Sequence, residues 1–256
     1  MAEKFREQAV VIRQEEISYG ICSMWLKTEQ IASRAKAGQF ISLYCRDGSR
    51  LLPRPISICE TDAADQALRI VYRVAGKGTE EFSHFGMGRH IEIVGPMGNG
   101  FPQKEKKAFL IGGGIGIPPL LQLAKELDCD KNIVLGYRDE PFLQEEFRKH
   151  GRVYIATEDG SYGTEGNVLD AIRENGLAAD IIYACGPTPM LRAIKEYAVK
   201  NGIECWLSLE ERMACGIGAC LACVCRSKEK DSHTNVHNKR VCKEGPVFRA
   251  EEVELS

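Results

Sequence analysis

The sequence predicts a multi-domain β plus α/β protein with three units: an antiparallel β-barrel, an α/β domain built on a parallel sheet, and a small C-terminal cysteine module. Three observations predict this arrangement. Short β-branched stretches separated by glycine and proline fill roughly the first hundred residues, and strand and helix patterns alternate over roughly the next hundred. The stretch "CGIGACLACVC", from Cys215 to Cys225, then sets four cysteines among small residues. We place the three units at residues 1–102, 103–205 and 206–256.

The composition excludes several classes of protein. The 256 residues carry a formal net charge of −2 and no basic stripe, which argues against nucleic acid as a partner. The N-terminal "MAEKFREQAV" is charged and lacks the apolar centre of a signal peptide, and no apolar run approaches the roughly 18 residues of a membrane span. We therefore expect a cytoplasmic protein with reduced thiols. Its eleven cysteines then indicate metal or redox chemistry rather than a disulfide framework.

The first unit is expected to consist mainly of strands. Each stretch is short, rich in β-branched residues and bounded by glycine or proline, as in an antiparallel barrel or sandwich. One helix is expected at 79–85, "TEEFSHF", with Thr79 as its N-cap. The expected strands are 8–17, 20–29, 38–45, 68–74 and 89–96.

The second unit alternates strands with helices, which predicts a parallel sheet covered on both faces. Glycine or proline follows most of the elements and sets their ends. The expected strands are 106–114, 131–138, 151–159 and 180–187. The expected helices are 118–127, 141–150, 167–175 and 188–202.

Two turns of the second unit are candidate ligand sites. Gly112, Gly113, Gly114 and Gly116 lie where a strand turns into a helix, so a phosphate could approach the backbone and the helix N-terminus. The run departs from G-x-G-x-x-G, and a tight turn without a ligand is the alternative. Cys185, Gly186 and Pro187 end the fourth strand and face the same crevice, because ligands of open α/β sheets bind at the carboxyl ends of the strands. Taken alone, Cys185 would more often be a packed residue.

Two further motifs lie in the first unit. Arg54, Pro55, Ile56 and Ser57 form a stretch in which prolines hold the chain extended and an arginine fork is suited to a phosphate. A strand over 68–74 then leads through glycines to the N-terminus of a short helix, which is a second anion site of the same type. The plainer interpretations are a rigid turn and a capped helix.

These four motifs, in this order, resemble those of the ferredoxin reductase superfamily of flavoproteins over about residues 5–205. The resemblance implies FAD in the barrel and NAD(P)H on a Rossmann-like α/β domain. It implies that Arg54 contacts the FAD pyrophosphate, that Ser57 lies near the flavin ring and that Cys185 lies close to the nicotinamide. The residues implied to line the flavin and ribose are Val71, Tyr72 and Arg73; those implied at phosphates are Gly78 and Thr79 for FAD and the glycines from Gly112 to Gly116 for the dinucleotide.

The cysteines of the third unit have the spacing of plant-type [2Fe–2S] ligands. Cys215, Cys220 and Cys223 stand in C-x4-C-x2-C spacing, and Cys242 follows at a distance. Small residues between them allow the tight turns and close backbone N–H groups that a cluster needs. A zinc site is the rival, but structural zinc usually has two C-x2-C pairs or paired cysteine and histidine. Cys225 could replace Cys223, but the spacing favours a spare small residue. His233 and His237 are expected in a polar surface loop.

The whole chain resembles the electron-transfer subunits of NAD-linked dihydroorotate dehydrogenase, although "RSKEKDSHTNVHNK" is long and polar for that family. The resemblance implies electron transfer between NADH, FAD and the cluster, and an FMN-containing catalytic subunit as partner in a heterotetramer of two plus two chains. A flavin is needed between the others because nicotinamide moves electron pairs and the cluster moves single electrons. The alternatives are a subunit of a ferredoxin–NADP or sulfide dehydrogenase or of anaerobic sulfite reductase, and, in another class, a zinc-bearing interaction protein.

The choice between NADH and NADPH depends on the loop after the second strand of the α/β unit. Asp139 or Glu140 could accept a hydrogen bond from a ribose 2′-hydroxyl, whereas Arg138 could meet a 2′-phosphate. All three could equally be solvated loop charges. The resemblance favours NAD.

Overall fold

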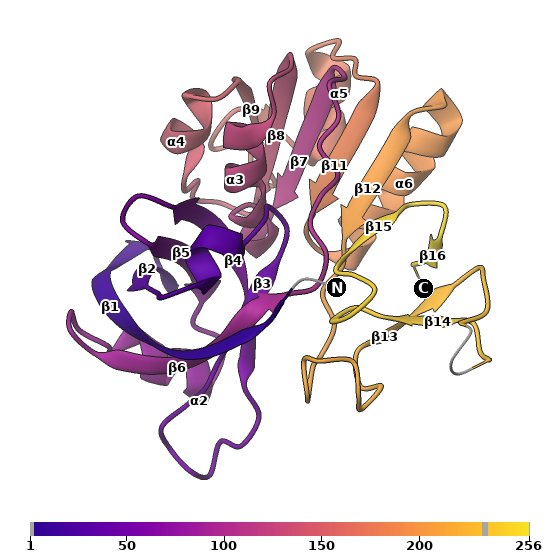
Figure 1. Ribbon diagram of the computed structural model, residues 1–256. Helices are drawn as coiled ribbons and strands as arrows, with labels where there is room; N and C mark the ends of the chain where they lie inside the picture. Colours follow the sequence, from indigo (N-terminus) through magenta and orange to yellow (C-terminus); the bar gives the residue numbers. More distant parts are fainter. Residues whose placement is uncertain (1–2, 232–234, 256) are drawn as a thin grey trace.

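A closed antiparallel β-barrel forms the N-terminal part of the computed structural model, which describes residues 3–231 and 235–255 (Figure 1). The strand order is β1-β2-β5-β4-β3-β6, and every neighbouring pair is antiparallel. Alternate side chains, such as Val11, Met24 and Ile70, point inward and form the barrel core. The strands are β1 Phe5–Ser18, β2 Ile21–Lys27, β3 Phe40–Leu43, β4 Arg54–Asp62, β5 Ala67–Arg73 and β6 His90–Met97.

Two details of the barrel correct the sequence prediction. The extended stretch at Arg54 is the beginning of a full strand, β4, which the prolines at its start had hidden. Helix α2 spans Lys77–Ser83, so Thr79 is its third residue and Gly76 is the N-cap. The Thr79 hydroxyl instead reaches back and accepts hydrogen bonds from the backbone N–H groups of Ala75 (2.9 Å) and Gly76 (3.2 Å). A short helix, α1, spans Ile31–Arg34.

A seven-stranded sheet of order β10-β9-β8-β7-β11-β12-β15 forms the second part. All pairs are parallel except β12 with β15. The expected boundary between residues 205 and 206 therefore falls inside β12, and β15 returns to the sheet from the cysteine-rich segment. The strands are β7 Ala108–Gly113, β8 Lys131–Tyr137, β9 Arg152–Thr157, β10 Thr164–Glu165, β11 Ile181–Cys185, β12 Glu204–Ser208 and β15 Val247–Arg249.

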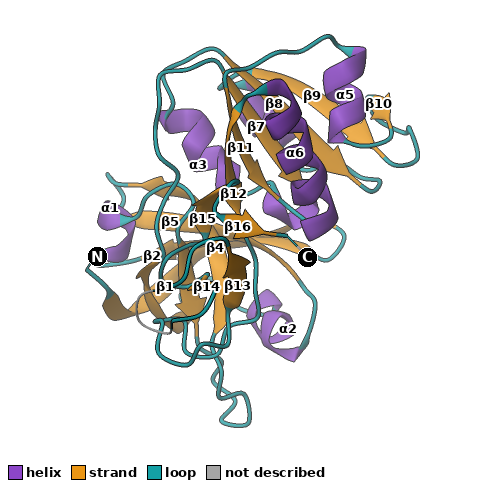
Figure 2. Ribbon diagram, turned by 90° about the vertical axis from the view of Figure 1, so that its right-hand side faces the viewer, coloured by secondary structure: helices purple, strands orange, loops and turns teal. Residues whose placement is uncertain are grey.

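Helices cover both faces of this sheet, as the alternating pattern predicted (Figure 2). Leu120 of α3 and Phe147 of α4 belong to the apolar cluster on one face, and Ala171 of α5 and Leu191 of α6 belong to the other. The first cluster also contains Val71 of the barrel, so the barrel packs against the α3 side. The helices are α3 Pro119–Glu126, α4 Gln144–Arg148, α5 Val168–Glu174 and α6 Thr188–Asn201.

The C-terminal part consists of a loop over residues 215–223, called the cysteine loop, and a small sheet of order β14-β13-β16. The strands are β13 Val224–Ser227, β14 Asn238–Arg240 and β16 Val253–Glu254. The Asn99 side chain fastens it to the end of the barrel, donating to the carbonyls of Glu244 (3.0 Å) and Val247 (2.7 Å) and accepting from the Val247 N–H (2.9 Å). Within the described ranges, none of the helices is long and apolar enough to cross a membrane.

Candidate functional site

A cavity of about 1060 Å³ lies where the three parts meet. The barrel, the turn after β11, the segment after β12 and the small C-terminal sheet all contribute to its wall. The Arg54 stretch and the turn after Cys185, which are far apart in the sequence, therefore meet in one place. The lining residues are Leu52, Pro53, Arg54, Pro55, Ile56, Thr79, Gly186, Pro187, Thr188, Leu191, Leu209, Glu210, Glu211, Arg212, Met213, Val224, Cys225, Arg226, Asn238, Glu254 and Leu255.

The barrel wall of this cavity presents an arginine against the first turn of α2. A Cβ added to Gly78 would lie 2.3 Å from Nε of Arg54, so the guanidinium rests directly on the backbone of residue 78. Arg54 also donates a hydrogen bond to the carbonyl of Leu52. A guanidinium beside backbone N–H groups is an arrangement that suits a pyrophosphate. Ser57 lies half-buried three residues further along β4.

The three residues expected to line the flavin from β5 do not share one face. The Tyr72 side chain is 1% exposed and packs edge-on against Phe82 in the barrel core, with 6.5 Å between ring centroids. Strand alternation thus points it away from the cavity, and any contact of residue 72 with a flavin would come from its backbone. Val71 is buried against the α/β domain, and Arg73 is exposed.

The two turns of the α/β domain pack on each other through their glycines. A Cβ on Gly116 would lie 2.5 Å from the carbonyl oxygen of Cys185, and one on Gly113 would lie 2.5 Å from Sδ of Met190. Gly114–Gly116 form a 3-10 turn that leads into α3. The crevice at the carboxyl ends of β7 and β11 is therefore built by backbone in close contact, which suits a bound dinucleotide phosphate.

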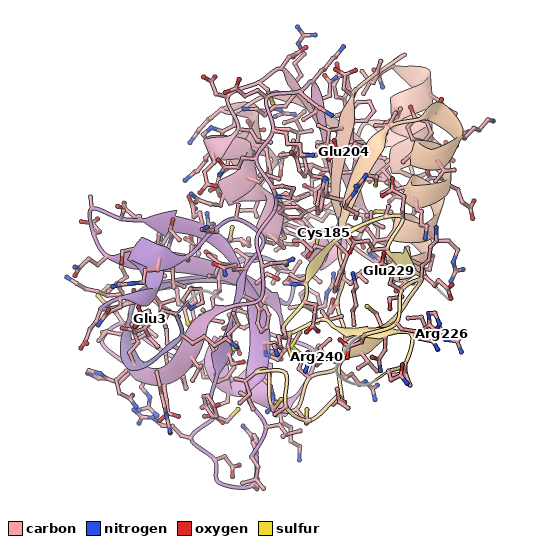
Figure 3. The ribbon with its side chains drawn as sticks, turned by 45° about the vertical axis from the view of Figure 1, so that its right-hand side comes forward. Glu3, Cys185, Glu204, Arg226, Glu229 and Arg240 are labelled. Carbon is pink, nitrogen blue, oxygen red and sulfur yellow. The ribbon has the colours of Figure 1, made fainter. Side chains whose placement is uncertain are left out.

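Cys185 ends β11, opposite Gly112 of β7 and Ser208 of β12 (Figure 3). Burial raises the pKa of its thiol to about 12. The nearby charge of Glu210 also raises this pKa, whereas a hydrogen bond with Ser208 lowers it. The thiol is therefore neutral at physiological pH.

The segment Leu209–Met213 is a part of the site that the sequence prediction missed. It leaves the carboxyl end of β12 and lines the cavity, with the Glu210 carboxylate near Cys185. The available signal was positional, because residues that follow the carboxyl end of a parallel strand lie at the ligand edge of the sheet. The boundary expected at 205/206 divides β12, so the segment after this strand was placed in the cysteine module.

The carboxylates after β8 are already engaged in the structure. Glu140 accepts a hydrogen bond from the Ser18 hydroxyl of the barrel (3.1 Å), and Asp139 accepts one from the backbone N–H of Glu140 (2.7 Å). Both side chains are exposed, as expected of loop charges, and that of Glu140 also makes a contact with the barrel.

The four expected cluster ligands form two pairs. The Cys215 sulfur accepts from the backbone N–H groups of Ala219 (3.3 Å) and Cys220 (3.4 Å), and the Cys220 sulfur accepts from the N–H of Cys215 (3.5 Å). The Cys223 sulfur accepts from the N–H of Cys242 (3.4 Å). Among the described residues no group of three or more His, Cys, Asp or Glu side chains is placed to hold a single metal ion. Two pairs suit a two-iron cluster, with two thiolates for each iron, better than one zinc ion.

The backbone of the cysteine loop favours ionised sulfur. Burial works against ionisation of Cys215, but hydrogen bonds from the N–H groups of Ile217, Ala219 and Cys220 and from the Cys220 thiol lower its pKa to about 6. Positive φ angles at Gly216 (66°), Gly218 (87°) and Leu221 (60°) turn these N–H groups inward.

Arg240 is a second feature that the sequence prediction missed. Its buried guanidinium donates to the carbonyl of Gly218 in the cysteine loop (2.9 Å) and to the Glu244 carboxylate (3.0 Å). The side chain, labelled in Figure 3, thus joins the loop of the first expected ligands to the segment that carries Cys242. Its proximity to the loop depends on folding of residues 22 positions apart, which no local pattern reveals.

The remaining candidates of this unit are not placed as ligands. Cys225 is buried, and its thiol donates to the carbonyl of Lys239 (3.5 Å) while its side chain contributes to the cavity wall. His237 is exposed, and its Nδ1 donates to the carbonyl of Lys228 (2.8 Å). His233 lies outside the described residues.

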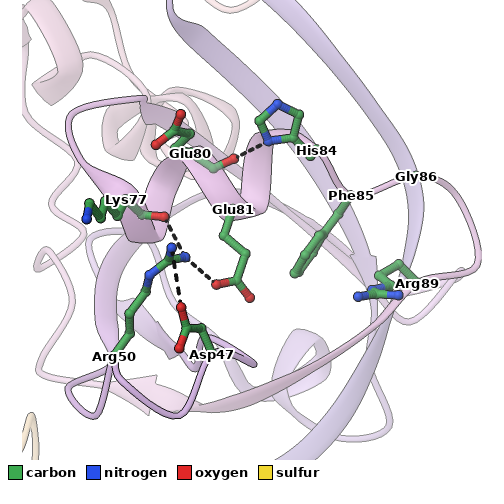
Figure 4. Close-up of a pocket in the computed structure, with 9 residues that line it drawn as sticks. All are labelled: Asp47, Arg50, Lys77, Glu80, Glu81, His84, Phe85, Gly86 and Arg89. Atoms are coloured by element: carbon green, nitrogen blue, oxygen red, sulfur yellow. Dashed lines mark hydrogen bonds and ion pairs between the residues drawn. The ribbon is translucent and has the colours of Figure 1, made fainter.

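A second hollow, of about 710 Å³, lies on the outer side of α2 (Figure 4). Among its charged side chains, Arg50 donates to Glu81 (2.6 Å) and lies 3.6 Å from Asp47, while His84 donates to the backbone carbonyl of Glu80 (2.7 Å). We assign no ligand to this hollow.

The fold and these sites define a flavin- and dinucleotide-dependent oxidoreductase of the ferredoxin reductase type with an added iron–sulfur module. Among solved structures, the chain is similar to an NADH-dependent reduced ferredoxin–NADP oxidoreductase, with a TM-score of 0.87, 28% identity, and coverage of 97% of this chain and 90% of the other. The ferredoxin reductase of carbazole 1,9a-dioxygenase shares the fold, with a TM-score of 0.64 and 18% identity over 78% of this chain and 67% of the other.

Residues 210–254 match the family model of the iron–sulfur cluster binding domain of dihydroorotate dehydrogenase B. The chain is 41% identical to the electron transfer subunit of dihydroorotate dehydrogenase B (NAD(+)) from Fusobacterium nucleatum, over 97% of this chain and 98% of the relative. It is 44% identical to the subunit of the same name from Bacillus velezensis, over 94% and 95%. The chain belongs to this family of electron transfer subunits. FAD, NAD and a [2Fe–2S] cluster are its cofactors.

Proposed function

We propose that this chain carries electrons between NAD(H) at the α/β domain and the catalytic subunit of dihydroorotate dehydrogenase, by way of FAD in the barrel and the [2Fe–2S] cluster. The central cavity carries this proposal, because Arg54, Gly186 and Cys225 of the three parts line the same space. FAD, when bound there, exchanges electron pairs with a nicotinamide and single electrons with a cluster. The protein contributes position, since electron transfer requires the three groups to lie close together in a fixed order.

Each group of residues has a defined role in this proposal. Arg54 and the α2 backbone at Gly78 and Thr79 hold the FAD pyrophosphate. Pro55 and Ile56, which line the cavity, border the flavin together with Ser57, the next residue of β4. The turns at Gly112–Gly116 and Gly186–Pro187 hold the dinucleotide, with the neutral Cys185 thiol packed at the nicotinamide. The cluster ligands are Cys215, Cys220, Cys223 and Cys242.

The partner in this proposal is the FMN-containing catalytic subunit, in a heterotetramer of two plus two chains in the cytoplasm. The names of the relatives, as electron transfer subunits, support a separate catalytic chain. The exposed Cys220 and the apolar side chains beside it, Ile217 (51% exposed) and Leu221 (41% exposed), support docking of that chain at the cysteine loop. Electrons enter or leave the subunit there.

A reductase subunit of the ferredoxin–NADP type is the second candidate, favoured by the similarity to the solved oxidoreductase over nearly the whole chain. Anaerobic purification from the native host, followed by an assay of NADH-dependent reduction of orotate, separates the two. Activity in the complex that is absent from the isolated partner supports the first. Reduction of flavin and cluster by NADH without reduction of orotate supports the second. A colourless protein that contains zinc would contradict both.

A further inference from the structure

A buried network of ion pairs crosses the interface between the barrel and the α/β domain. Arg69 of β5 donates through Nη1 to Glu60 of β4 (2.9 Å) and to Glu146 of α4 (2.6 Å), and through Nε to the Ser23 hydroxyl (2.8 Å). Lys125 of α3 donates to the second oxygen of Glu60. The Arg69 and Glu60 side chains are only 6% and 7% exposed. Two barrel strands and two helices of the other domain therefore meet through one set of charges.

Apolar contacts make up most of the rest of this interface, beside the Ser18–Glu140 and Thr61–Gln122 hydrogen bonds. Ile21 and Val71 of the barrel share a cluster with Ile117 and Leu120 of the α/β domain. Apolar contacts of this kind are not directional, so they permit small rotations and slips at little cost. A buried guanidinium that must satisfy two carboxylates tolerates much less displacement, because an unpaired buried charge is costly.

The network joins the same elements that carry the two cofactor motifs. Strand β4 begins at Arg54 and reaches the network at Glu60, and the next N–H, of Thr61, donates to the Gln122 side chain of α3 (2.9 Å). Helix α3 follows the glycine turn and reaches the network at Lys125. At about 3.3 Å per strand residue and about 1.5 Å per helix residue, the part of β4 and the part of α3 that lie between a cofactor motif and the network are each on the order of 10–20 Å long. Both parts are regular secondary structure, so a shift at the network is transmitted to both motifs.

We propose that the Arg69 network is the device that positions the nicotinamide of NADH over the flavin, with Arg69, Glu60, Glu146 and Lys125 as positioning residues for hydride transfer. This inference rests on the proposed function. Reacting atoms must approach to about 3–3.5 Å for hydride transfer, and a misplacement of about 1 Å can cost about a hundredfold in rate. The network acts on the angle between the domains and touches neither cofactor motif directly.

The test is the variant Glu146→Ala, with Glu145→Ala as its matched control. Glu146 is the partly exposed member of the network (36%), and its removal leaves the Arg69–Glu60 pair and the Ser23 contact in place. Glu145 is its neighbour on α4 and pairs only with the exposed Arg148 of the same helix in the described contacts. The measurement is anaerobic stopped-flow reduction of FAD by saturating NADH in the purified complex, together with the NADH dissociation constant.

We expect Glu146→Ala to lower the rate constant of flavin reduction at least tenfold, with NADH affinity within about twofold and with unchanged flavin and cluster spectra. The control should behave as the wild type, and Glu146→Gln, which keeps a hydrogen-bond acceptor for Arg69, should recover part of the rate. An unchanged rate constant in Glu146→Ala, even with a lower melting temperature, overturns the proposal. If Glu146→Ala does not fold, the double variant that combines Glu146→Gln with Lys125→Met takes its place. A wild-type rate in the double variant overturns the proposal, and a tenfold loss of rate supports it. Failure of NADH to reduce the wild-type flavin would instead overturn the proposed function.

Discussion

The guanidinium of Arg54 lies so close to Gly78 that a Cβ on residue 78 would stand 2.3 Å from Nε and 2.8 Å from Cζ of the arginine. The residues come from different elements, the start of β4 and the first turn of α2. The space beside Gly78 is therefore filled by the end of the Arg54 side chain, and the backbone angles of Gly78 do not themselves call for glycine, since it is absent from the residues with positive φ.

Gly78→Ala should therefore weaken FAD binding. The methyl group must push the Arg54 side chain out of place, and the pyrophosphate then loses a charge-assisted contact. We expect at least a tenfold rise in the FAD dissociation constant, or about 1.4 kcal/mol, measured by fluorescence titration of the apoprotein. Gly86→Ala is the control, because a Cβ at Gly86 has no atom within 4 Å. Equal FAD affinity in the two variants would contradict the arrangement.

Gly116→Ala should impair the dinucleotide site and leave the flavin site intact. A Cβ there would meet the carbonyl carbon of Cys185 at 2.6 Å, so the glycine turn and the Cys185 turn must separate. Because the obstacle is backbone, local side-chain movement cannot relieve it. We expect a rise in the NADH Michaelis constant or a loss of flavin reduction by at least tenfold, with FAD content unchanged. Wild-type kinetics would show that the two turns need not touch.

The Cys185 thiol should not shape the pH dependence of NADH oxidation. Burial raises its pKa to about 12, so the thiol stays protonated as pH rises from 6 to 9, and no ionisation of this group falls in that range. Cys185→Ser should lower the rate while keeping the same profile of rate against pH. A profile in which Cys185→Ser removes an ionisation between pH 6 and 9 would show that the thiolate takes part.

Most helices and strands of the α/β domain, such as α3 and β8, could be predicted because strand and helix patterns alternate and because glycine and proline mark their ends. Strand β4 could not, since the prolines at its start are typical of turns. Strand β12 was hidden for another reason. Its five residues precede the cysteine loop, whose composition dominates the segment.

The site was predictable to the extent that its residues form local motifs. Arg54, Gly116 and the first three expected cluster ligands each belong to a short pattern with a chemical reason. Tyr72 was assigned to the flavin as part of a stretch, and only strand alternation in the folded barrel separates it from Val71. Contacts such as Arg69–Glu146, which join residues 77 positions apart, depend on how two domains pack and leave no local signal.

Cys220→Ser and Cys225→Ser should have opposite effects on the cluster. Cys220 belongs to a sulfur pair with Cys215, whereas the Cys225 thiol points to the carbonyl of Lys239. We expect the first variant to lose the visible absorbance of the cluster and most of its iron, and the second to keep both. The measurement is the absorbance spectrum and the iron content after anaerobic purification. Loss of iron in Cys225→Ser with retention in Cys220→Ser would reverse the assignment.

Arg240→Gln should loosen the cysteine loop without removing a ligand. The guanidinium holds the Gly218 carbonyl and is itself held by Glu244, so the substitution breaks a buried link between the two segments that carry the ligands. Loss of such a hydrogen bond to a charged group costs about 1.5–3 kcal/mol. We therefore expect the cluster absorbance to decay at least several-fold faster at a fixed temperature. Lys239→Gln is the matched control, since Lys239 pairs with the half-exposed Glu252 instead (2.8 Å). Equal decay in both variants would show that Arg240 does not hold the loop.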